Sequence, residues 1–212
     1  MLDSTWARRL GVRRSGGMYR ITRREFTERL TQLQHGEHFV GFYETEAFLV
    51  DSVRDYLAAG LITGDAGIVV ATEAHRDSFD RALMAAGIEL PEAHRRGRFI
   101  ALDVSEALAM FMVDGMPDAA RFKAAMGQLV SRAAESARQL RIYGEMVAVL
   151  WNEGNIAAAI ALEDLWNDLA ASYPFSLFCA YPMRAFDRDG SNDGFRTICG
   201  QHSRVLLQRQ GS

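Results

Sequence analysis

The sequence is poor in the features that mark disulfide-linked, membrane-spanning and secreted proteins. Its 212 residues include only two cysteines, Cys179 and Cys199, which are too few for a disulfide framework. We therefore expect two buried thiols in a reducing cytoplasm. Apolar runs such as residues 156–162 are much shorter than the about 18 residues of a membrane helix. The Arg-rich beginning of the chain lacks the apolar region of a secretory signal. These absences predict a cytoplasmic protein that does not enter a membrane.

The motifs of common nucleotide-binding and hydrolytic enzymes are also missing. There is no G-x-x-x-x-G-K-[ST] loop, and no G-x-G-x-x-G follows a predicted strand. The single lysine, Lys123, lies within a predicted helix. No G-x-S-x-G elbow is present, and the five histidines lack the spacing of a zinc motif. The sequence thus predicts no cofactor and no metal site, although a pairing between the distant residues His38 and His202 stays open.

The net charge of −3 hides an uneven distribution along the chain. Residues 1–30 contain eight arginines against three acidic residues, so the remainder of the chain is acidic. A basic arm on an acidic body can bind nucleic acid or an acidic partner. The Gly16-Gly17 pair is more typical of a mobile leader than of a folded nucleic-acid reader. We therefore do not predict nucleic-acid binding, and we divide the chain into a partly flexible leader (1–34), one domain (35–205) and a tail (206–212).

Short apolar runs alternate with segments of helical periodicity from His38 onward. The predicted strands are residues 38–44, 67–72, 98–103, 140–145 (running on towards Val149) and 175–181. The predicted helices are residues 45–61, 73–86, 106–113, 119–139 and 156–172, followed by a docked helix at 195–205 and a fraying end from Arg204. Strands separated by helical stretches of about 12 or more residues need crossover connections. The sequence therefore predicts an α/β fold, a mostly parallel sheet of five or more strands with helices on both faces.

Polar and titratable side chains stand where the predicted strands end. In an open parallel sheet, ligands bind outside the carboxyl ends of the strands. The candidate ligand-binding residues at these ends are Tyr43, Glu44, His75, Asp103, Tyr143, Glu145 and Tyr181. Strand ends are also polar simply because they reach the surface, and helix starts favour capping residues, which accounts for Thr45 and Ser105.

Glu145 is the candidate that surface polarity explains least well. It lies between Gly144 and the apolar Met146, so its carboxylate must be paired or must line a cavity. The groups that we expect near it are His75, Arg184 and the hydroxyls of Tyr43 and Tyr181. A binding-site carboxylate and a purely structural ion pair both remain open at this point.

Several segments together resemble one known family. They are residues 38–44, residues 51–61 with Gly64-Asp65, residues 143–155 with Y-G-E-M, residues 162–167 with L-E-D-L-W-N, residues 177–182 with C-A-Y-P, and residues 198–205. This combination resembles the MEDS family, the sensory domain shared by methanogen and methylotroph proteins and the dichloromethane-responsive repressor. The resemblance implies a three-layer RecA/KaiC-like core without a phosphate-binding loop. It also implies a sensor for a small, hydrocarbon-derived ligand, in many relatives attached to an output module.

We accordingly expect a non-enzymatic sensory domain that binds a small molecule at the carboxyl edge of its sheet. Because no output module is recognisable in the sequence, its signal would pass to a regulatory protein partner or to a second copy of the chain. One alternative is a ligand-free interaction module for a kinase or a sigma-control protein. Another is a degenerate ATPase-like enzyme in which Glu145 is the catalytic carboxylate.

Overall fold

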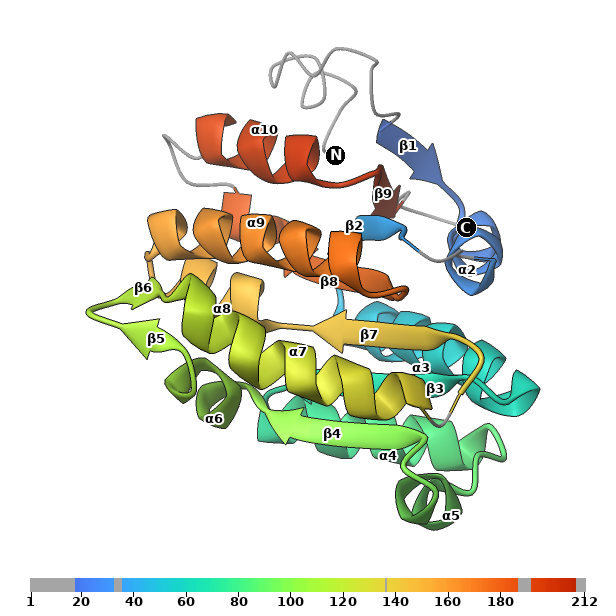
Figure 1. The fold of residues 1–212 in the computed structure, drawn as a ribbon. Coiled ribbons are helices and arrows are strands. Elements are labelled where there is room, and N and C mark those ends of the chain that lie inside the picture. Colours follow the sequence, from blue (N-terminus) through green and yellow to red (C-terminus); the bar gives the residue numbers. More distant parts are fainter. Residues whose placement is uncertain (1–17, 33–35, 136, 187–191, 209–212) are drawn as a thin grey trace.

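A seven-stranded sheet forms the centre of the computed structural model, which describes residues 18–32, 36–135, 137–186 and 192–208. Its strand order is β1-β9-β2-β8-β7-β3-β4, and every neighbouring pair is parallel (Figure 1). The strands are β1 (Met18–Ile21), β2 (His38–Tyr43), β3 (Ala66–Ala71), β4 (Phe99–Asp103), β7 (Leu140–Gly144), β8 (Ser176–Pro182) and β9 (Arg204–Gln208). The predicted parallel α/β fold and the five predicted strands, β2, β3, β4, β7 and β8, are confirmed. Residues 1–17 of the predicted leader (1–34) lie outside the described residues.

The sheet extends beyond β2 by two strands that were not predicted. β9 pairs with β2 on one side and with β1 on the other. The expectation of a fraying end from Arg204 is therefore wrong for residues 204–208, and Val205, Leu206 and Leu207 are buried. The preceding helix, α10 (Asn192–Gln201), ends before His202 instead of continuing to residue 205. Three consecutive apolar residues are too short a signal to separate a strand from the end of a helix.

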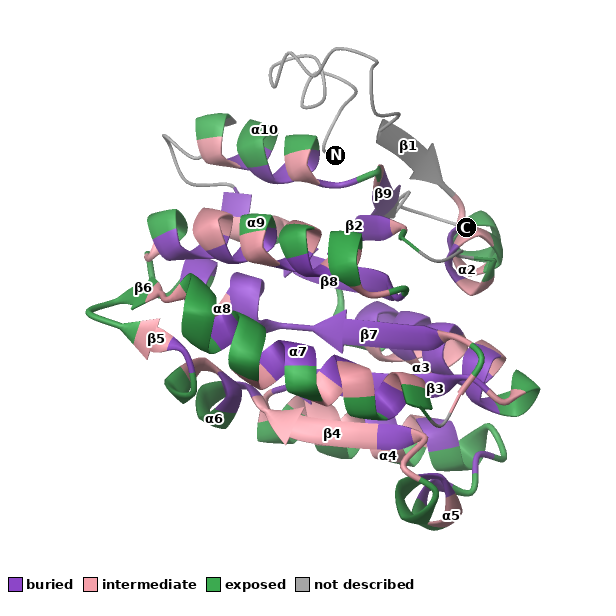
Figure 2. Ribbon diagram, in the orientation of Figure 1, coloured by how far each residue is buried: buried purple, intermediate pink, exposed green. Residues whose placement is uncertain are grey.

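Helices cover both faces of the sheet, which gives three layers (Figure 1). One face packs against α2 (Arg23–Thr31), α3 (Glu46–Thr63), α4 (Glu73–Ala85) and α5 (Leu90–Arg95). The other face packs against α6 (Val104–Ala109), α7 (Ala119–Glu135), α8 (Met146–Asn152), α9 (Ile156–Ser172) and α10. Figure 2 shows that the central strands are buried, whereas the edge strand β4 is only partly covered. Side chains of alternate residues along each strand therefore enter two separate cores.

Local signals set the ends of several helices. The Thr45 side chain accepts a hydrogen bond from the Phe48 N–H at the start of α3, and Gly64 ends that helix with a φ of +92°. The Asn155 side chain caps α9 in the same way as Thr45 caps α3. α7 ends at Glu135, four residues before its predicted end, and the predicted extension of β7 towards Val149 is wrong because α8 begins there instead.

An antiparallel hairpin replaces the end of the helix predicted at residues 106–113. Its strands are β5 (Met112–Val113) and β6 (Met116–Pro117), joined by Asp114 and Gly115, both with positive φ. Asn155 Nδ2 donates a hydrogen bond to the Gly115 carbonyl at 2.6 Å, which ties the hairpin to the start of α9. Pro117 and Gly115 break the helix, as the sequence indicated, but the break comes earlier than predicted.

A buried charge network lies at the opposite, amino-terminal end of β7. Arg141 is 6% exposed and donates to Asp65 Oδ2 at 3.4 Å and to the carbonyls of Tyr56 and Thr31. It therefore links β7 to α3 and α2. In the described part of the chain, no helix is both long and apolar enough to span a membrane.

Candidate functional site

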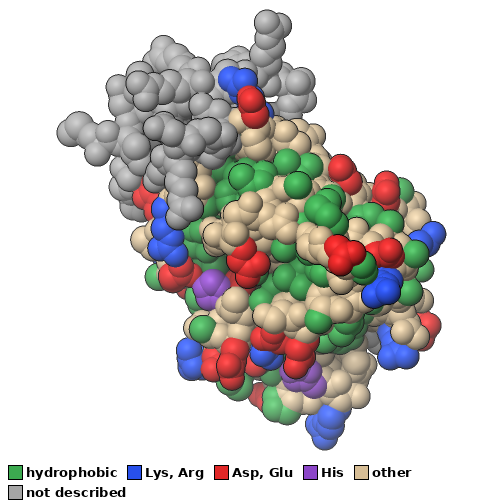
Figure 3. All heavy atoms as spheres, turned by 90° about the vertical axis from the view of Figure 1, so that its left-hand side faces the viewer, with side chains coloured by type: hydrophobic (Ala, Val, Ile, Leu, Met, Phe, Trp, Pro, Cys, Tyr) green, Lys and Arg blue, Asp and Glu red, His purple; other side chains and the backbone are tan. Residues whose placement is uncertain are grey.

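The carboxyl ends of β2, β7 and β3 carry the group of side chains that we consider the candidate site. β3 and β7 are neighbours, with Val70 opposite Gly144, and the Glu145 N–H donates to the Val70 carbonyl at 2.9 Å. α8 begins immediately after Glu145 and α4 begins immediately after Thr72. The side chain of Glu145 and the backbone of Thr72 are thus brought to the same point of the sheet edge, which Figure 3 shows face-on.

Glu145 is 4% exposed and is held by three groups. The Thr72 backbone N–H donates to Oε2 at 2.9 Å, and the Tyr143 hydroxyl donates to Oε1 at 3.1 Å. His75 forms an ion pair with Oε1 through Nδ1. A buried carboxylate needs hydrogen-bond donors or a cation around it, and Glu145 has both. The sequence-based expectation that Glu145 is paired, and that His75 is one of its partners, is therefore confirmed.

His75 lies between two carboxylates. Its Nε2 is 2.7 Å from Glu46 Oε2, while its Nδ1 faces Glu145. The hydrogen bond with Glu145 raises the pKa of His75 to about 9, because it outweighs the opposing effect of burial. His75 is therefore a cation at neutral pH. Arg184 lies 3.8 Å from Glu46 Oε1, so it approaches the group through Glu46 and not through Glu145.

Two tyrosines complete the group. Tyr143 is fully buried, and burial together with the charge of Glu145 raises the pKa of Tyr143 well above its usual value. Burial and the charge of Glu46 also raise the pKa of Tyr43, a residue that is 8% exposed. Both tyrosines are neutral donors at neutral pH.

Open space lies at the carboxyl end of β7, beside the residue that precedes Glu145. Gly144 is buried, yet a methyl group built on it meets no atom within 4 Å among the described residues other than its two chain neighbours. Protein interiors are normally packed closely, so a buried glycine with unfilled space beside it is uncommon.

Asp103 and Glu44, two further predicted site residues, lie at the same edge of the sheet. Asp103 caps α6 by accepting from the Ser105 N–H at 2.8 Å, and it also accepts from Arg76 Nη2 at 3.2 Å. The Ser105 hydrogen bond lowers the pKa of Asp103. Glu44 is exposed at the end of β2. The structure therefore gives Asp103 a structural task, whereas Glu44 lies at the surface just after β2.

Tyr181 lies on the opposite face of the sheet from Tyr143, so it does not join the Glu145 group. Its hydroxyl donates to Glu163 Oε1 at 2.9 Å, within the core formed by α9. Cys179, two residues earlier on β8, faces the same side, where the structure also places His38 and His202. The predicted proximity of Tyr181 to Glu145 is wrong because the strand register, which the sequence did not reveal, decides which face each tyrosine enters.

Glu163 is a buried polar residue that sequence reasoning missed, as it also missed the Arg141–Asp65 pair. It lies within α9 and is fully buried, on the same helix face as Ala159 and Trp166. A glutamate that falls on the apolar stripe of a predicted helix is the signal that could have identified it. Among the described residues, Glu163 together with His38, Cys179 and His202 forms the group whose chemistry suits a metal ion.

Exposed apolar side chains surround the hairpin at the carboxyl edge. They are Met110, Val113, Met116 and Ile156, each at least one-third exposed. Hydrophobic and acidic side chains occur together on this side of the molecule (Figure 3). Such a surface can contact the apolar part of a ligand or a partner protein.

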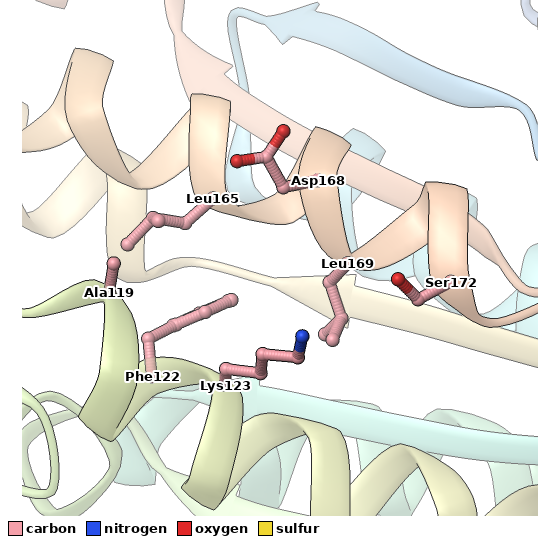
Figure 4. A pocket seen from close by; sticks show the side chains of 7 residues that line it. All are labelled: Ala119, Phe122, Lys123, Leu165, Asp168, Leu169 and Ser172. Atoms are coloured by element: carbon pink, nitrogen blue, oxygen red, sulfur yellow. The ribbon is translucent and has the colours of Figure 1, made fainter.

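A separate cavity of about 170 Å³ lies between α7 and α9 (Figure 4). Phe122, Leu165 and Leu169 form its apolar walls, and Lys123 and Asp168 add charged groups. Ligand pockets usually have volumes of about 300 Å³ or more. We therefore do not consider this cavity the principal ligand site.

Comparison with known proteins identifies a family and a structural neighbour. The model of the MEDS family, described as the methanogen/methylotroph, DcmR sensory domain, matches residues 37–197. A solved KaiC-like protein from the hyperthermophilic archaeon Pyrococcus horikoshii has a TM-score of 0.56 and 14% sequence identity to this chain. The similarity covers 84% of this chain and 75% of that protein, and at this identity it shows a shared fold. No match was found among curated protein sequences.

Proposed function

Because the chain belongs to the MEDS family of sensory domains, we propose that it detects a small molecule at the carboxyl edge of its sheet. The observation that carries this proposal is the group of Glu145, His75 and Tyr43. It combines a buried carboxylate, a cationic imidazole that still reaches solvent, and a nearly buried phenol. Small-molecule sites typically pair an apolar wall with a few convergent polar groups of this kind.

The chemistry of the group favours a ligand with one polar head that both donates and accepts hydrogen bonds. Glu46 and Glu145 accept, whereas His75 and the Tyr43 hydroxyl donate. A short-chain alcohol meets these requirements, because its hydroxyl both donates and accepts, and its hydrocarbon part suits the apolar surface at the same edge. Ligand binding would compete with the Glu46–His75 contact, because that contact is the exposed part of the group.

A thermal-shift experiment tests this proposal on the full chain. The probes are a panel of one- to four-carbon alcohols, amines, carboxylates and halogenated methanes. A ligand present at about 100 times its dissociation constant stabilises the folded state by about 2.7 kcal/mol. For a chain of this size that corresponds to a rise in Tm of roughly 5–10 °C.

Two matched variants make the result specific to the site. We expect the Tm rise in the wild type and in Glu44→Gln, whose side chain is exposed at the same edge, and its loss in Glu145→Gln. No rise with any probe in the panel, or an equal rise in Glu145→Gln, would contradict a ligand site at Glu145.

A protein-interaction surface is the second candidate function, favoured by the exposed Met110, Met116 and Ile156. In that case the domain would signal by contact with a regulatory partner or with a second copy of the chain. Sedimentation analysis of the wild type and Met116→Ser tests the second-copy version. Self-association in the wild type that is weakened in Met116→Ser supports it, and a monomer at all concentrations contradicts it.

Nucleotide hydrolysis is not part of the proposed function. A triphosphate needs backbone amides and a lysine at its phosphates, and the sequence has no phosphate-binding loop. We expect ATP turnover with magnesium to equal that of buffer alone. Turnover that disappears in Glu145→Gln would instead support the ATPase-like alternative.

A further inference from the structure

Four buried side chains from four parts of the chain converge on one point of the core under α9. They are His38 at the start of β2, Glu163 in α9, Cys179 in β8 and His202 just after α10. One ligand atom of each lies within 4.8 Å of all the others. Glu163 and the His202 side chain are fully buried, and His38 is 4% exposed. This group is independent of the Glu145 group, because it lies on the opposite face of the sheet.

The hydrogen bonds around the group fix which nitrogen of His38 carries a proton. Asn167 Nδ2 donates to the Gln201 carbonyl at 3.1 Å, so its Oδ1 points the other way. That oxygen lies 2.9 Å from His38 Nδ1, which must therefore be the donor. In the neutral imidazole, the Nε2 of His38 then presents a lone pair to the centre of the group.

His202 is oriented by the same principle. Its Nδ1 lies 2.6 Å from the Ile198 carbonyl, which can only accept a hydrogen bond. Its Nε2 is buried and has no hydrogen-bond partner in the structure's described part, although it faces Glu163 Oε2 at 3.5 Å. A buried, unpartnered nitrogen lone pair beside a carboxylate oxygen is unfavourable unless a cation lies between them.

Glu163 presents one oxygen to the centre and keeps the other occupied. The Tyr181 hydroxyl donates to Oε1, and Oε2 faces both histidines. Outer groups of this kind orient the ligands of most protein metal sites, since the second nitrogen of a ligating histidine usually donates to a carbonyl or carboxylate. Here the outer groups of the two histidines and of Glu163 are all present.

The spacing among His38, Cys179 and Glu163 is close to that of tetrahedral coordination, and all four ligand atoms lie within 4.8 Å of one another. His38 Nε2 lies 3.3 Å from both Cys179 Sγ and Glu163 Oε2, and Cys179 Sγ lies 3.8 Å from Glu163 Oε2. Zinc bonds of about 2.0–2.3 Å in a tetrahedron place neighbouring ligand atoms about 3.3–3.7 Å apart. A thiolate and a carboxylate would also neutralise a divalent ion, which removes the cost of burying net charge.

We propose that His38, Glu163, Cys179 and His202 bind one zinc ion, or a similar divalent transition metal, in a closed four-ligand site. The mixed nitrogen, sulfur and oxygen donors favour zinc over magnesium or calcium, which prefer oxygen ligands. With four protein ligands the site has no open position, so the ion would hold β2, β8, α9 and the His202 turn together. It would thereby anchor β9 to the sheet.

Metal loading is tested by refolding, because a buried site is not reached by simple addition. The full chain is unfolded in denaturant with a chelator, freed of metal, and refolded with one equivalent of Zn²⁺ or Co²⁺ under a non-thiol reductant. Metal per chain is measured after gel filtration. Cobalt also reports its ligands, through a thiolate charge-transfer band and the intense visible bands of tetrahedral coordination. We expect about one metal per chain and both spectroscopic features.

Matched variants identify the ligands. Cys179→Ser and His202→Gln should weaken metal binding at least tenfold. Cys199→Ser and His94→Gln should retain one metal, because Cys199 and the exposed His94 lie outside the group. A charge-transfer band that survives in Cys179→Ser, or that is lost equally in Cys199→Ser, would overturn the assignment. If the ligand variants do not fold, the wild type alone decides: refolded protein without stoichiometric metal, or a cobalt spectrum without the thiolate band, overturns the proposal.

Discussion

Replacing Glu145 with glutamine removes one negative charge from the carboxyl edge and keeps the shape of the side chain. Glu145 accepts from the Thr72 N–H and the Tyr143 hydroxyl and pairs with His75. The amide of glutamine has one acceptor oxygen where the carboxylate has two. The variant therefore loses a charge partner for His75 and weakens one of the two hydrogen bonds.

The size of the loss follows from the pKa of His75. A rise from 6.5 to about 9 corresponds to at most about 3 kcal/mol of interaction favouring the folded state, because solvent that reaches His75 screens part of the interaction. Because the folded pKa is raised, this contribution is complete below pH 6.5 and disappears as the pH rises through 9. Glu46 still contacts His75 in the variant. We therefore expect Glu145→Gln to lose about 2 kcal/mol of the His75 interaction energy at pH 6. The weakened hydrogen bond adds about 1 kcal/mol at any pH.

Urea unfolding at pH 6 and at pH 10, followed by tryptophan fluorescence, measures this difference. We expect Glu145→Gln to be about 3 kcal/mol less stable than the wild type at pH 6 and only about 1 kcal/mol less stable at pH 10. A double-mutant cycle with His75→Gln should give a coupling of about 2 kcal/mol at pH 6. The reasoning is refuted if the loss is equal at both pH values or if the coupling is zero.

Three further substitutions test contacts of the fold away from Glu145. Tyr56→Phe should cost about 1–2 kcal/mol in urea unfolding, because the fully buried hydroxyl donates to the Ser176 carbonyl at 2.8 Å; no loss would contradict that bond. Gly60→Ala should cost several kcal/mol, since its methyl group would lie 2.5 Å from Arg141 Nε, a guanidinium with little room to move; a neutral effect in thermal denaturation would show that Arg141 shifts freely. Asp103→Ala should lower the unfolding free energy through loss of the α6 cap. Because the pKa of Asp103 is lowered, the difference from wild type should shrink as the pH falls below 4.

Hydrophobic patterning was sufficient to predict the parallel sheet and its central strands. Near-continuous apolar runs such as residues 67–71 have few alternatives once helical segments separate them. β9 and α8 were missed for a common reason. Each is a short apolar segment whose conformation is decided by its neighbours, β2 for Val205 and the helix-capping position of Glu145 for α8.

The sequence predicted only those parts of the candidate site that depend on local secondary structure. Glu145 and His75 were both expected at the sheet edge, because one follows β7 and the other lies in the first turn of α4. Tyr181 was assigned to the wrong group, since the face that a strand residue enters depends on register. The four residues of the proposed metal site are far apart in sequence, and no spacing rule connects His38 with His202; only the fold brings their rings to 4.0 Å.

Native mass spectrometry of the freshly purified chain, without added ligand, tests the central claim most directly. The claim is that the carboxyl edge around Glu145 holds a small molecule. We predict an adduct of about one molecule per chain in the wild type and in Glu44→Gln. We predict no adduct in folded Glu145→Gln that has been expressed and purified in the same way. An adduct that is equally abundant in Glu145→Gln, or no adduct in any sample after soaking with the panel of short alcohols and amines, would contradict the claim.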